Sequence, residues 1–397
     1  MSKRLSALVL YTLILLTFPG CKKSPEKKPL EPYEQKREEV KKIVQEKSSD
    51  EAVEEILKGM TLEEKVWQMM FVQPEDITKV SEVYSAGETT QKAIEKYPVG
   101  GIIYFAPNLK DSNQTAQMIS NTQSYSKIPL FISVDEEGGK VSRLGSNPQM
   151  GTTKHPSMAE IGEAKDPEKA YKVGETLAKE LKELGFNVDF APVADVLIIE
   201  NNTEIGDRSF GYDVENVSLM VENVVKGLRE NGISSALKHF PGAGAVTGDS
   251  HEKPTESNRT IEQIRENELK PFKAGIDAGA DFVMISHLIL TEASKEKIPC
   301  SLSEEVIEKM LKEELGFKGI VITDSLKMNA VSKIYTPSQI GVMSINAGVD
   351  MILMPSDLDA THSGIVNAVK SGEISEKRIN ESVRKILKLK IEKGMWK

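Results

Sequence analysis

Side chains of the kinds that carry out acid–base and nucleophilic chemistry follow five consecutive apolar runs, at the point where each run stops. They are Asp135, Asp195, Lys238 with His239, His287 and Asp324. A carboxylate can act as a nucleophile, and an imidazole can donate and accept a proton near neutral pH. Any one of these residues alone could cap a helix or form an ion pair. Their recurrence indicates that they gather at one face, as catalytic groups do at the strand ends of a parallel barrel.

The apolar runs themselves predict the elements that position these side chains. Eight runs cover residues 67–72, 101–105, 130–134, 187–193, 233–238, 281–286, 319–323 and 349–354. They are rich in β-branched residues and mostly lack alternation with polar residues, which is typical of strands buried on both faces. Amphipathic helices are expected between several of them, for example over 170–184, ending at Gly185, and over 214–230, ending before Gly232.

Strands that alternate with helices predict an α/β fold with a parallel sheet. We expect a TIM-type (β/α)8 barrel as a single catalytic domain over residues 51–397, and a doubly wound open sheet is the competing arrangement. Thr61 and Glu64 are expected to form a capping box that opens a helix. Residues 373–389 are expected to form a closing amphipathic helix.

The N-terminal residues 1–20 have the pattern of an export signal. Lys3 and Arg4 precede an apolar run over 5–16 that is short for a membrane span. The segment that ends in Gly20-Cys21 is similar to the site at which bacterial lipoproteins are cut and lipidated, so Cys21 is the expected lipidation site. An ordinary signal peptide is the alternative.

Residues 21–50 are rich in Lys, Glu and Pro and poor in apolar residues, so we expect a flexible tether. Its later part, 38–47, could form a solvated helix. A lipid on Cys21 would hold the chain on the periplasmic side or the outer surface of a bacterial membrane, and the chain would then be extracytoplasmic.

Composition limits the classes of partner. The formal net charge of −9 argues against a nucleic-acid partner, because phosphate binding needs a basic face. The apolar fraction of 39% and the charged fraction of 28% are those of an ordinary globular protein. If Cys21 carries lipid, the one other cysteine, Cys300, has no intramolecular partner and is expected to be structural.

Two segments carry a family resemblance. Lys238-His239-Phe240-Pro241-Gly242-Ala243-Gly244, followed by Asp249-Ser250-His251, resembles glycoside hydrolase family 3, in its β-N-acetylhexosaminidase branch. Supporting segments occur in the family's order at 134–139, 206–211 and 323–328. The resemblance extends from about Leu62 to Leu389.

The resemblance implies roles for individual residues. Asp324 matches the family's catalytic nucleophile, His251 its general acid/base, and Asp249 the carboxylate that orients that histidine. The residues that match the family's sugar-binding set are Asp135, Arg143, Arg208, Lys238 and His239. His287 could line the pocket or be a satisfied buried histidine. Glu136 and Glu137 are ambiguous, with a structural role favoured for Glu137.

The implied reaction is the hydrolysis of terminal β-linked N-acetylglucosamine with retention of configuration, through a covalent glycosyl-enzyme and with no metal or organic cofactor. An oligosaccharide or muropeptide is the implied partner, so peptidoglycan fragments and chitin oligosaccharides both fit. Two departures from the family pattern affect the substrate more than the reaction. Ala243 stands where histidine is usual, and Lys140 stands where arginine is common.

Other functions remain open from the sequence. Within the family, a β-glucosidase or β-xylosidase usually takes its acid/base from a second domain, and the segment 249–251 argues against that class. A phosphorylase is another candidate, because a neutral histidine would not repel phosphate. A non-catalytic sugar-binding lipoprotein is the alternative of a different class.

Overall fold

The computed structural model describes residues 32–247 and 254–396, and eight parallel strands form its central sheet. In chain order they are β1 (Met70–Val72), β2 (Gly101–Ile103), β3 (Phe131–Val134), β6 (Val188–Asp189), β7 (Ser234–Phe240), β9 (Phe282–Ile285), β11 (Ile320–Thr323) and β12 (Ile352–Leu353). Their order across the sheet is β11-β9-β7-β6-β3-β2-β1-β12. Short strands outside this sheet are β4 (Glu136–Gly138), β5 (Val141–Ser142), β8 (Glu256–Ser257) and β10 (Ile289–Leu290).

The sheet closes into a barrel between its first and last strands. A parallel bridge joins Ile322 of β11 to Met351, directly before β12. Rings then meet across the interior: Phe131 and Phe282 lie 5.3 Å apart although two strands separate β3 from β9, and Phe71 lies 5.3 Å from Phe190. The expected barrel is therefore confirmed, and its centre is a packed core.

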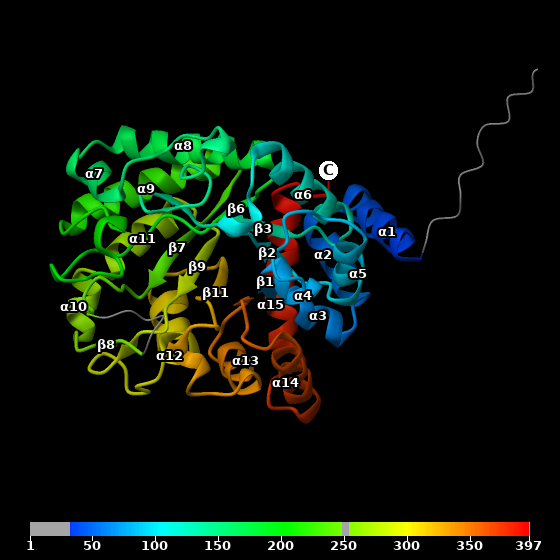
Figure 1. Cartoon of the computed structure of the whole chain (residues 1–397). Coiled ribbons are helices and arrows are strands. Elements are labelled where there is room, and N and C mark those ends of the chain that lie inside the picture. The colour runs from blue at the N-terminus through cyan, green and yellow to red at the C-terminus, as the bar shows by residue number, and fades with distance from the viewer. Residues whose placement is uncertain (1–31, 248–253, 397) are drawn as a thin grey trace, which may run out of the picture.

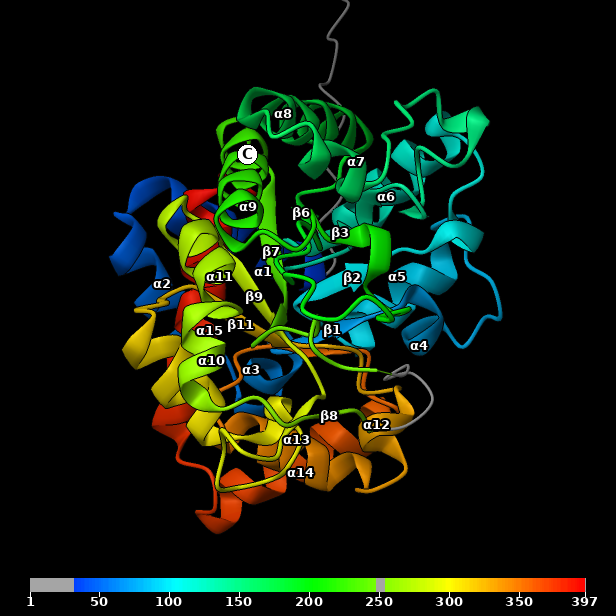
Figure 2. The same ribbon diagram turned by 90° about the vertical axis from the view of Figure 1, so that its left-hand side faces the viewer.

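Helices cover the outside of this barrel (Figures 1 and 2). They are α1 (Pro32–Glu46), α2 (Ser49–Lys58), α3 (Leu62–Gln68), α4 (Pro74–Thr78), α5 (Glu88–Lys96), α6 (Ser112–Ser124), α7 (Met158–Glu163), α8 (Pro167–Leu184), α9 (Val214–Glu230), α10 (Ile261–Glu266), α11 (Leu269–Asp277), α12 (Asn329–Ser332), α13 (Pro337–Asn346), α14 (Leu358–Ser371) and α15 (Glu376–Glu392). Short 3-10 turns cover Ala106–Asn108, Pro148–Met150, Gly206–Arg208 and Cys300–Leu302, and a π-helical segment covers Glu305–Glu314. In Figure 2, α8, α9 and α11 lie outside β7 and β9.

The C-terminal helix closes the end of the barrel at which the strands begin. Lys390 of α15 is fully buried, donates to Gln68 Oε1 at 2.9 Å and lies 4.9 Å from the centre of the Phe131 ring. Burial holds the pKa of its ammonium well below the usual range. Gln68 in turn donates to the carbonyl oxygens of Pro98 and Val99, which precede β2. The functional side chains must therefore use the opposite, carboxyl-terminal face.

The predicted strands all form, but several are shorter than the apolar runs. The run at 67–72 begins within α3, because Thr61 and Glu64 form the expected capping box and the helix continues to Gln68. Trp67 then stacks on His362 of α14, with ring centres 3.8 Å apart, outside the barrel. In the run at 187–193 the ladder stops after Asp189, near Pro192, which has no amide hydrogen to donate.

Part of the expected tether is helical instead. The solvated helix anticipated at 38–47 is α1, which begins at Pro32, and α2 already begins at Ser49. Val40 is buried, and Ile43 and Val44 pack against the core at helical spacing, so this helix has an apolar stripe. The later part of the expected tether is therefore the helix that was allowed for there, and it begins earlier and has an apolar side that packs against the core. Residues 1–31, with Cys21, lie outside the described residues, and no helix of the described part is long and apolar enough to cross a bilayer.

Candidate active site

A pocket of about 410 Å³ opens at the carboxyl-terminal face of the barrel. Its wall includes the residue after β3, the end of β7 and the residue after β11, which are Asp135, Lys238 with His239, and Asp324. Arg143 and Arg208 line it as well. The volume is within the range of about 300–1,000 Å³ that is typical of small-ligand sites. The structure thus brings together all of the predicted sugar-binding residues and the predicted nucleophile.

A buried network of charges fixes one side of this pocket. Lys238 Nζ lies 2.7 Å from Asp135 Oδ1 and 2.5 Å from Glu137 Oε1. Arg208 donates twice to Glu137, from Nε and from Nη2, each at 2.8 Å. Burial alone would raise the pKa of Glu137, but Lys238 and Arg208 outweigh it and lower that pKa to about 2. Glu137 therefore stays ionised and neutralises two cations at once.

His239 is oriented by a second buried carboxylate. Asp195, which is fully buried, accepts from His239 Nδ1 at 2.7 Å and from the His239 backbone amide at 3.1 Å. The bond to a carboxylate assigns the proton to Nδ1, so Nε2 is an acceptor, and Arg208 Nη2 lies 3.2 Å from it. The imidazole is thus held in one tautomer beside the pocket.

Asp324 lines the pocket, close to His239, His287 and Lys238. Its Oδ1 accepts from the Ser325 amide at 2.6 Å, and its own amide donates to the Ile285 carbonyl of the neighbouring strand. Burial would raise the pKa of Asp324, but the nearby His239, His287 and Lys238 outweigh that effect and hold the pKa below its ordinary value. The carboxylate is therefore ionised at neutral pH, as a nucleophile must be.

Arg143 reaches the pocket from the β4–β5 hairpin, opposite Lys238. Its Nη2 lies 4.0 Å from Asp135 Oδ2, and its guanidinium carbon lies 5.9 Å from the centre of the Phe105 ring. The turn of this hairpin uses Gly138 and Gly139 at φ of 92° and 57°. A Cβ at Gly139 would also lie 2.9 Å from the Ser157 Cα, so the turn requires glycine.

His287 does not line the pocket. It is buried, with Nδ1 2.8 Å from Ser301 Oγ and Nε2 3.0 Å from the Ser325 carbonyl. Of the two expected alternatives, His287 is therefore the satisfied buried histidine. It lies near Asp324 and helps to lower the pKa of that carboxyl. Cys300 is likewise buried and free, as expected for a structural cysteine.

Asp249 and His251 lie outside the described residues, but the chain next to them is anchored at the same face. Asp195 Oδ1 accepts from the Ala243 amide at 2.7 Å, and Asn202 donates to the Ala243 carbonyl. Beyond the gap, the Thr255 carbonyl accepts from the amide of Ile289, after β9. The described residues on either side of positions 248–253 are therefore attached to the face that holds the pocket.

Sequence reasoning underestimated two carboxylates. The sequence places Asp195 only at a strand end and leaves Glu137 ambiguous, with a structural role favoured. In the structure they determine the positions of His239, Lys238 and Arg208. Their neighbours gave a signal, because a buried Lys and Arg need acceptors. Glu204 and Lys327, which also line the pocket, were not anticipated. Lys140, which stands where arginine was expected, pairs with Asp207 at 2.9 Å, and both side chains are about half exposed.

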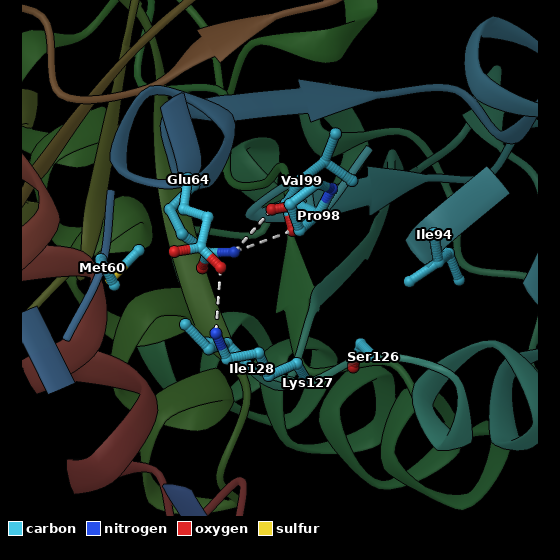
Figure 3. A pocket seen from close by; sticks show the side chains of 9 residues that line it. Met60, Glu64, Ile94, Pro98, Val99, Ser126, Lys127 and Ile128 are labelled. Atoms are coloured by element: carbon cyan, nitrogen blue, oxygen red, sulfur yellow. Dashed lines mark hydrogen bonds and ion pairs between the residues drawn. The ribbon is translucent and has the colours of Figure 1, made fainter. Parts of the chain in front are cut away.

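A second hollow lies at the opposite end of the barrel, between α3 and the segments that precede β2 and β3 (Figure 3). Glu64 pairs with Lys127 across it. Its free volume of about 10 Å³ is close to that of a single water-sized sphere, which is too small for a sugar. Among residues 32–247 and 254–396, no group of three or more His, Cys, Asp or Glu side chains has an arrangement that could hold a metal ion.

Comparison with known proteins identifies similar sequences and folds. Residues 61–389 match the model of the glycosyl hydrolase family 3 N-terminal domain. The chain is 32% identical over 325 residues to beta-hexosaminidase A of Pseudoalteromonas piscicida, covering 75% of this chain and 54% of that protein. It is 32% identical over 289 residues to a beta-hexosaminidase of Methylobacillus flagellatus, covering 70% of this chain and 81% of that protein.

Solved structures give the same result. A family 3 β-N-acetylglucosaminidase from Paenibacillus sp. str. FPU-7 superposes with a TM-score of 0.79 at 36% identity, over 84% of this chain and 63% of that one. A β-N-acetylhexosaminidase from Beutenbergia cavernae gives a TM-score of 0.73 at 27% identity, over 83% of this chain and 98% of that one. The chain thus spans about half the length of the Pseudoalteromonas protein and less than two thirds of the Paenibacillus chain.

The charge network predicts a pH-dependent loss of stability in Glu137→Gln. This variant leaves Lys238 and Arg208 without their shared counter-ion in a buried site, which costs about 3–5 kcal/mol in the free energy of unfolding at pH 7. The folded pKa of about 2 is depressed below the unfolded value near 4.3, so Glu137 stabilises the fold above about pH 4 and loses this effect as pH falls toward 2. Urea unfolding between pH 7 and pH 2.5 measures this difference.

The matched control is Glu175→Gln on the outer face of α8. Glu175 also accepts from two lysines and its pKa is also lowered to about 2, but its ion pairs are at the surface. Surface pairs contribute little, so we expect almost no change in this variant. A stability difference for Glu137→Gln that stays constant across the pH range would contradict the assignment of the shift to this network.

Proposed function

Because the chain belongs to glycoside hydrolase family 3, we propose that it is a retaining exo-acting β-N-acetylhexosaminidase. The observation that carries the proposal is the ionised Asp324 in a pocket whose wall presents Asp135, Lys238 and His239. The names of its relatives support the N-acetylhexosaminide class. A dense set of charged donors and acceptors suits a sugar, whose hydroxyl groups form directional hydrogen bonds to such groups.

The proposed reaction has two steps. In the first, the Asp324 carboxylate forms a bond to the anomeric carbon while the bond to the leaving oxygen breaks, and His251 gives that oxygen a proton. In the second, His251 takes a proton from water, the water oxygen bonds to the anomeric carbon, and Asp324 is released. Two displacements at the same carbon restore the original configuration.

Each wall residue has a separate task in this proposal. Asp135 accepts from sugar hydroxyl groups and pairs with Lys238. Arg208 and Arg143 donate to sugar oxygens, and His239 holds Arg208 in place through Nε2. Asp249 holds the His251 ring in the tautomer that the proton transfer needs, as the carboxylate does in a hydrolase triad.

The proposed substrates carry terminal β-linked N-acetylglucosamine, either on peptidoglycan fragments or on chitin oligosaccharides. We also propose that a lipid on Cys21 holds the enzyme at the extracytoplasmic side of a bacterial membrane. A location outside the cytoplasm would bring a peptidoglycan-directed enzyme to its polymer. The sequence pattern at residues 1–21 is the support for this part of the proposal.

A panel of chromogenic glycosides tests the activity and the nucleophile together. Wild type should cleave the β-N-acetylglucosaminide in preference to the β-glucoside and β-xyloside, releasing the free sugar both with and without phosphate. Asp324→Asn should lower kcat by about a thousandfold or more, because the amide cannot trap the anomeric carbon. Asp277→Asn, on the exposed face of α11, is the matched control and should retain full activity.

Two outcomes of this panel would reject the proposal. Formation of a sugar 1-phosphate that depends on phosphate would instead identify a phosphorylase. Absence of turnover on every glycoside, combined with binding of N-acetylglucosamine by calorimetry, would instead support a non-catalytic sugar-binding protein.

The acid/base assignment predicts a dependence on the leaving group. His251→Ala cannot protonate the departing oxygen, so it should lose about 100- to 10,000-fold of kcat/KM on natural disaccharide linkages. It should lose much less on a nitrophenyl or dinitrophenyl glycoside, whose leaving group needs no proton. Measurement of kcat/KM on both kinds of substrate checks this. Natural-linkage turnover near that of wild type would remove His251 from the mechanism.

The anchor is tested by Cys21→Ser in the full-length chain expressed in a bacterial host. Wild type should sediment with membranes and enter the detergent phase on phase separation, whereas Cys21→Ser should not enter it. Lys22→Ala, one residue away, is the control and should behave like wild type. An unmodified, water-soluble mature wild-type chain would leave an ordinary signal peptide as the explanation of residues 1–21.

A further inference from the structure

The β4–β5 hairpin is built around the carboxylate of Glu136, which is only 2% exposed. This carboxylate accepts hydrogen bonds from four donors on the returning part of the same hairpin. Its Oε2 accepts from the backbone amides of Arg143 at 2.7 Å and Leu144 at 2.8 Å, and its Oε1 accepts from the Gly145 amide at 3.1 Å and from the Ser142 hydroxyl. A single side chain thus fixes the backbone from residue 142 to residue 145.

The residues around Glu136 leave room for a glycine at position 145 but not for a larger residue. A Cβ at Gly145 would lie 2.7 Å from the Thr153 carbonyl and 3.3 Å from Glu136 Oε1, so only glycine brings its amide this close. The amide of Glu136 itself donates to Asp189 Oδ1 at 3.0 Å, which ties the start of the hairpin to β6. The start of the hairpin is therefore attached to the barrel wall, and its returning part is attached to that start through Glu136.

This hairpin carries two of the pocket's residues. Asp135 directly precedes Glu136, and the Arg143 amide is one of the four donors. The Arg143 side chain has few contacts of its own: Nη2 is 4.0 Å from Asp135, and the guanidinium lies over Phe105. Its Nε is buried and has no hydrogen-bond partner among the described residues. The place of this guanidinium therefore depends on the backbone from which it extends.

We propose that Glu136 is a positioning residue, which holds the backbone of Arg143 so that the guanidinium presents its donors to the bound sugar. Glu136 does not line the pocket and does not touch the substrate; it acts through Arg143. This inference rests on the proposed glycosidase function, because it assigns Arg143 to sugar binding. It gives a specific role to a residue that the sequence left ambiguous.

The charge of Glu136, and not only its shape, is required for this role. An amide of the same size has one oxygen, which can accept two of the four hydrogen bonds, and an NH2 group that would face the other two donors. With the amide oxygen at the Oε2 position, the NH2 group faces the Ser142 hydroxyl, which can turn to accept from it, and the Gly145 amide. The Gly145 amide would then be buried without an acceptor, at a cost that favours a shifted hairpin. A shift of about 1 Å is enough to misplace a substrate-binding group.

A double-mutant cycle of Glu136→Gln and Arg143→Ala tests the proposal in the full-length protein. Each single variant should raise KM for the chromogenic N-acetylglucosaminide by roughly ten- to hundredfold, the effect of losing hydrogen bonds to a charged group. The loss in kcat should be smaller than the rise in KM. The double variant should match Arg143→Ala within about twofold, because a residue that acts through Arg143 has no further effect once Arg143 is absent.

The matched control is Glu305→Gln. Glu305 also holds a loop, by accepting from the Ser294 hydroxyl and the Lys295 amide, but that loop does not line the pocket. Its KM should equal that of wild type. Urea unfolding of all variants, at the assay temperature, establishes that each is folded when it is assayed.

The outcomes separate the inference from the function on which it rests. If wild type and the control turn over the glycoside and the two substitutions multiply in their effect on KM, then Glu136 acts independently of Arg143 and the inference is wrong. An unchanged KM in Glu136→Gln would overturn it as well. If wild type itself turns over none of the glycosides, the proposed function has failed, and a cycle on the Kd for N-acetylglucosamine then tests the positioning role alone.

Discussion

The site depends on the neutralisation of two cations that the fold buries at the mouth of its barrel. Lys238 and Arg208 would be costly to bury alone, and Glu137 offsets both, with Asp135 as the second partner of Lys238. This sharing has a consequence for sugar binding. Glu137 accepts from both cations, so Lys238 needs only Oδ1 of Asp135 in addition. One carboxylate in the pocket wall thus carries most of the neutralisation, and Asp135 is left to take part in the proposed sugar binding.

Lys238, one of these two cations, also lies near Asp324, the proposed nucleophile. His239, His287 and Lys238 keep the pKa of Asp324 low despite its burial. A low pKa reduces the basicity of the nucleophile, which slows attack, but it makes the carboxylate a better leaving group when water displaces it. For a two-step reaction these effects oppose one another. In the proposed reaction, the groups that lower the pKa of Asp324 favour the second step. The first step is helped separately, by proton donation to the leaving oxygen.

The eight strands were predictable because each one is buried on both faces and therefore appears as a continuous apolar run. Their ends were not, since boundaries depend on local competitors such as the capping box of α3 and Pro192 after β6. The pocket residues were predictable where they follow strands. Arg143 and Arg208, which lie on loops, came from the family resemblance. The role of Glu136 could not be predicted from sequence, because hydrogen bonds to backbone amides leave no pattern of residue types. For Glu137 the signal was indirect, since a buried Lys and Arg need an acceptor.

The alanine at position 243 shows why a departure from the family pattern need not disturb the pocket. The polar contacts of this residue come from its backbone: the amide donates to Asp195 and the carbonyl accepts from Asn202. Its methyl group does not line the pocket and packs in a small apolar cluster with Val193, Leu197 and Ile205. Any side chain that leaves the backbone in place preserves the contact with Asp195, and through it the orientation of His239. What this position supplies to the site is therefore a peptide group, and the small apolar side chain is suited to the packing around it.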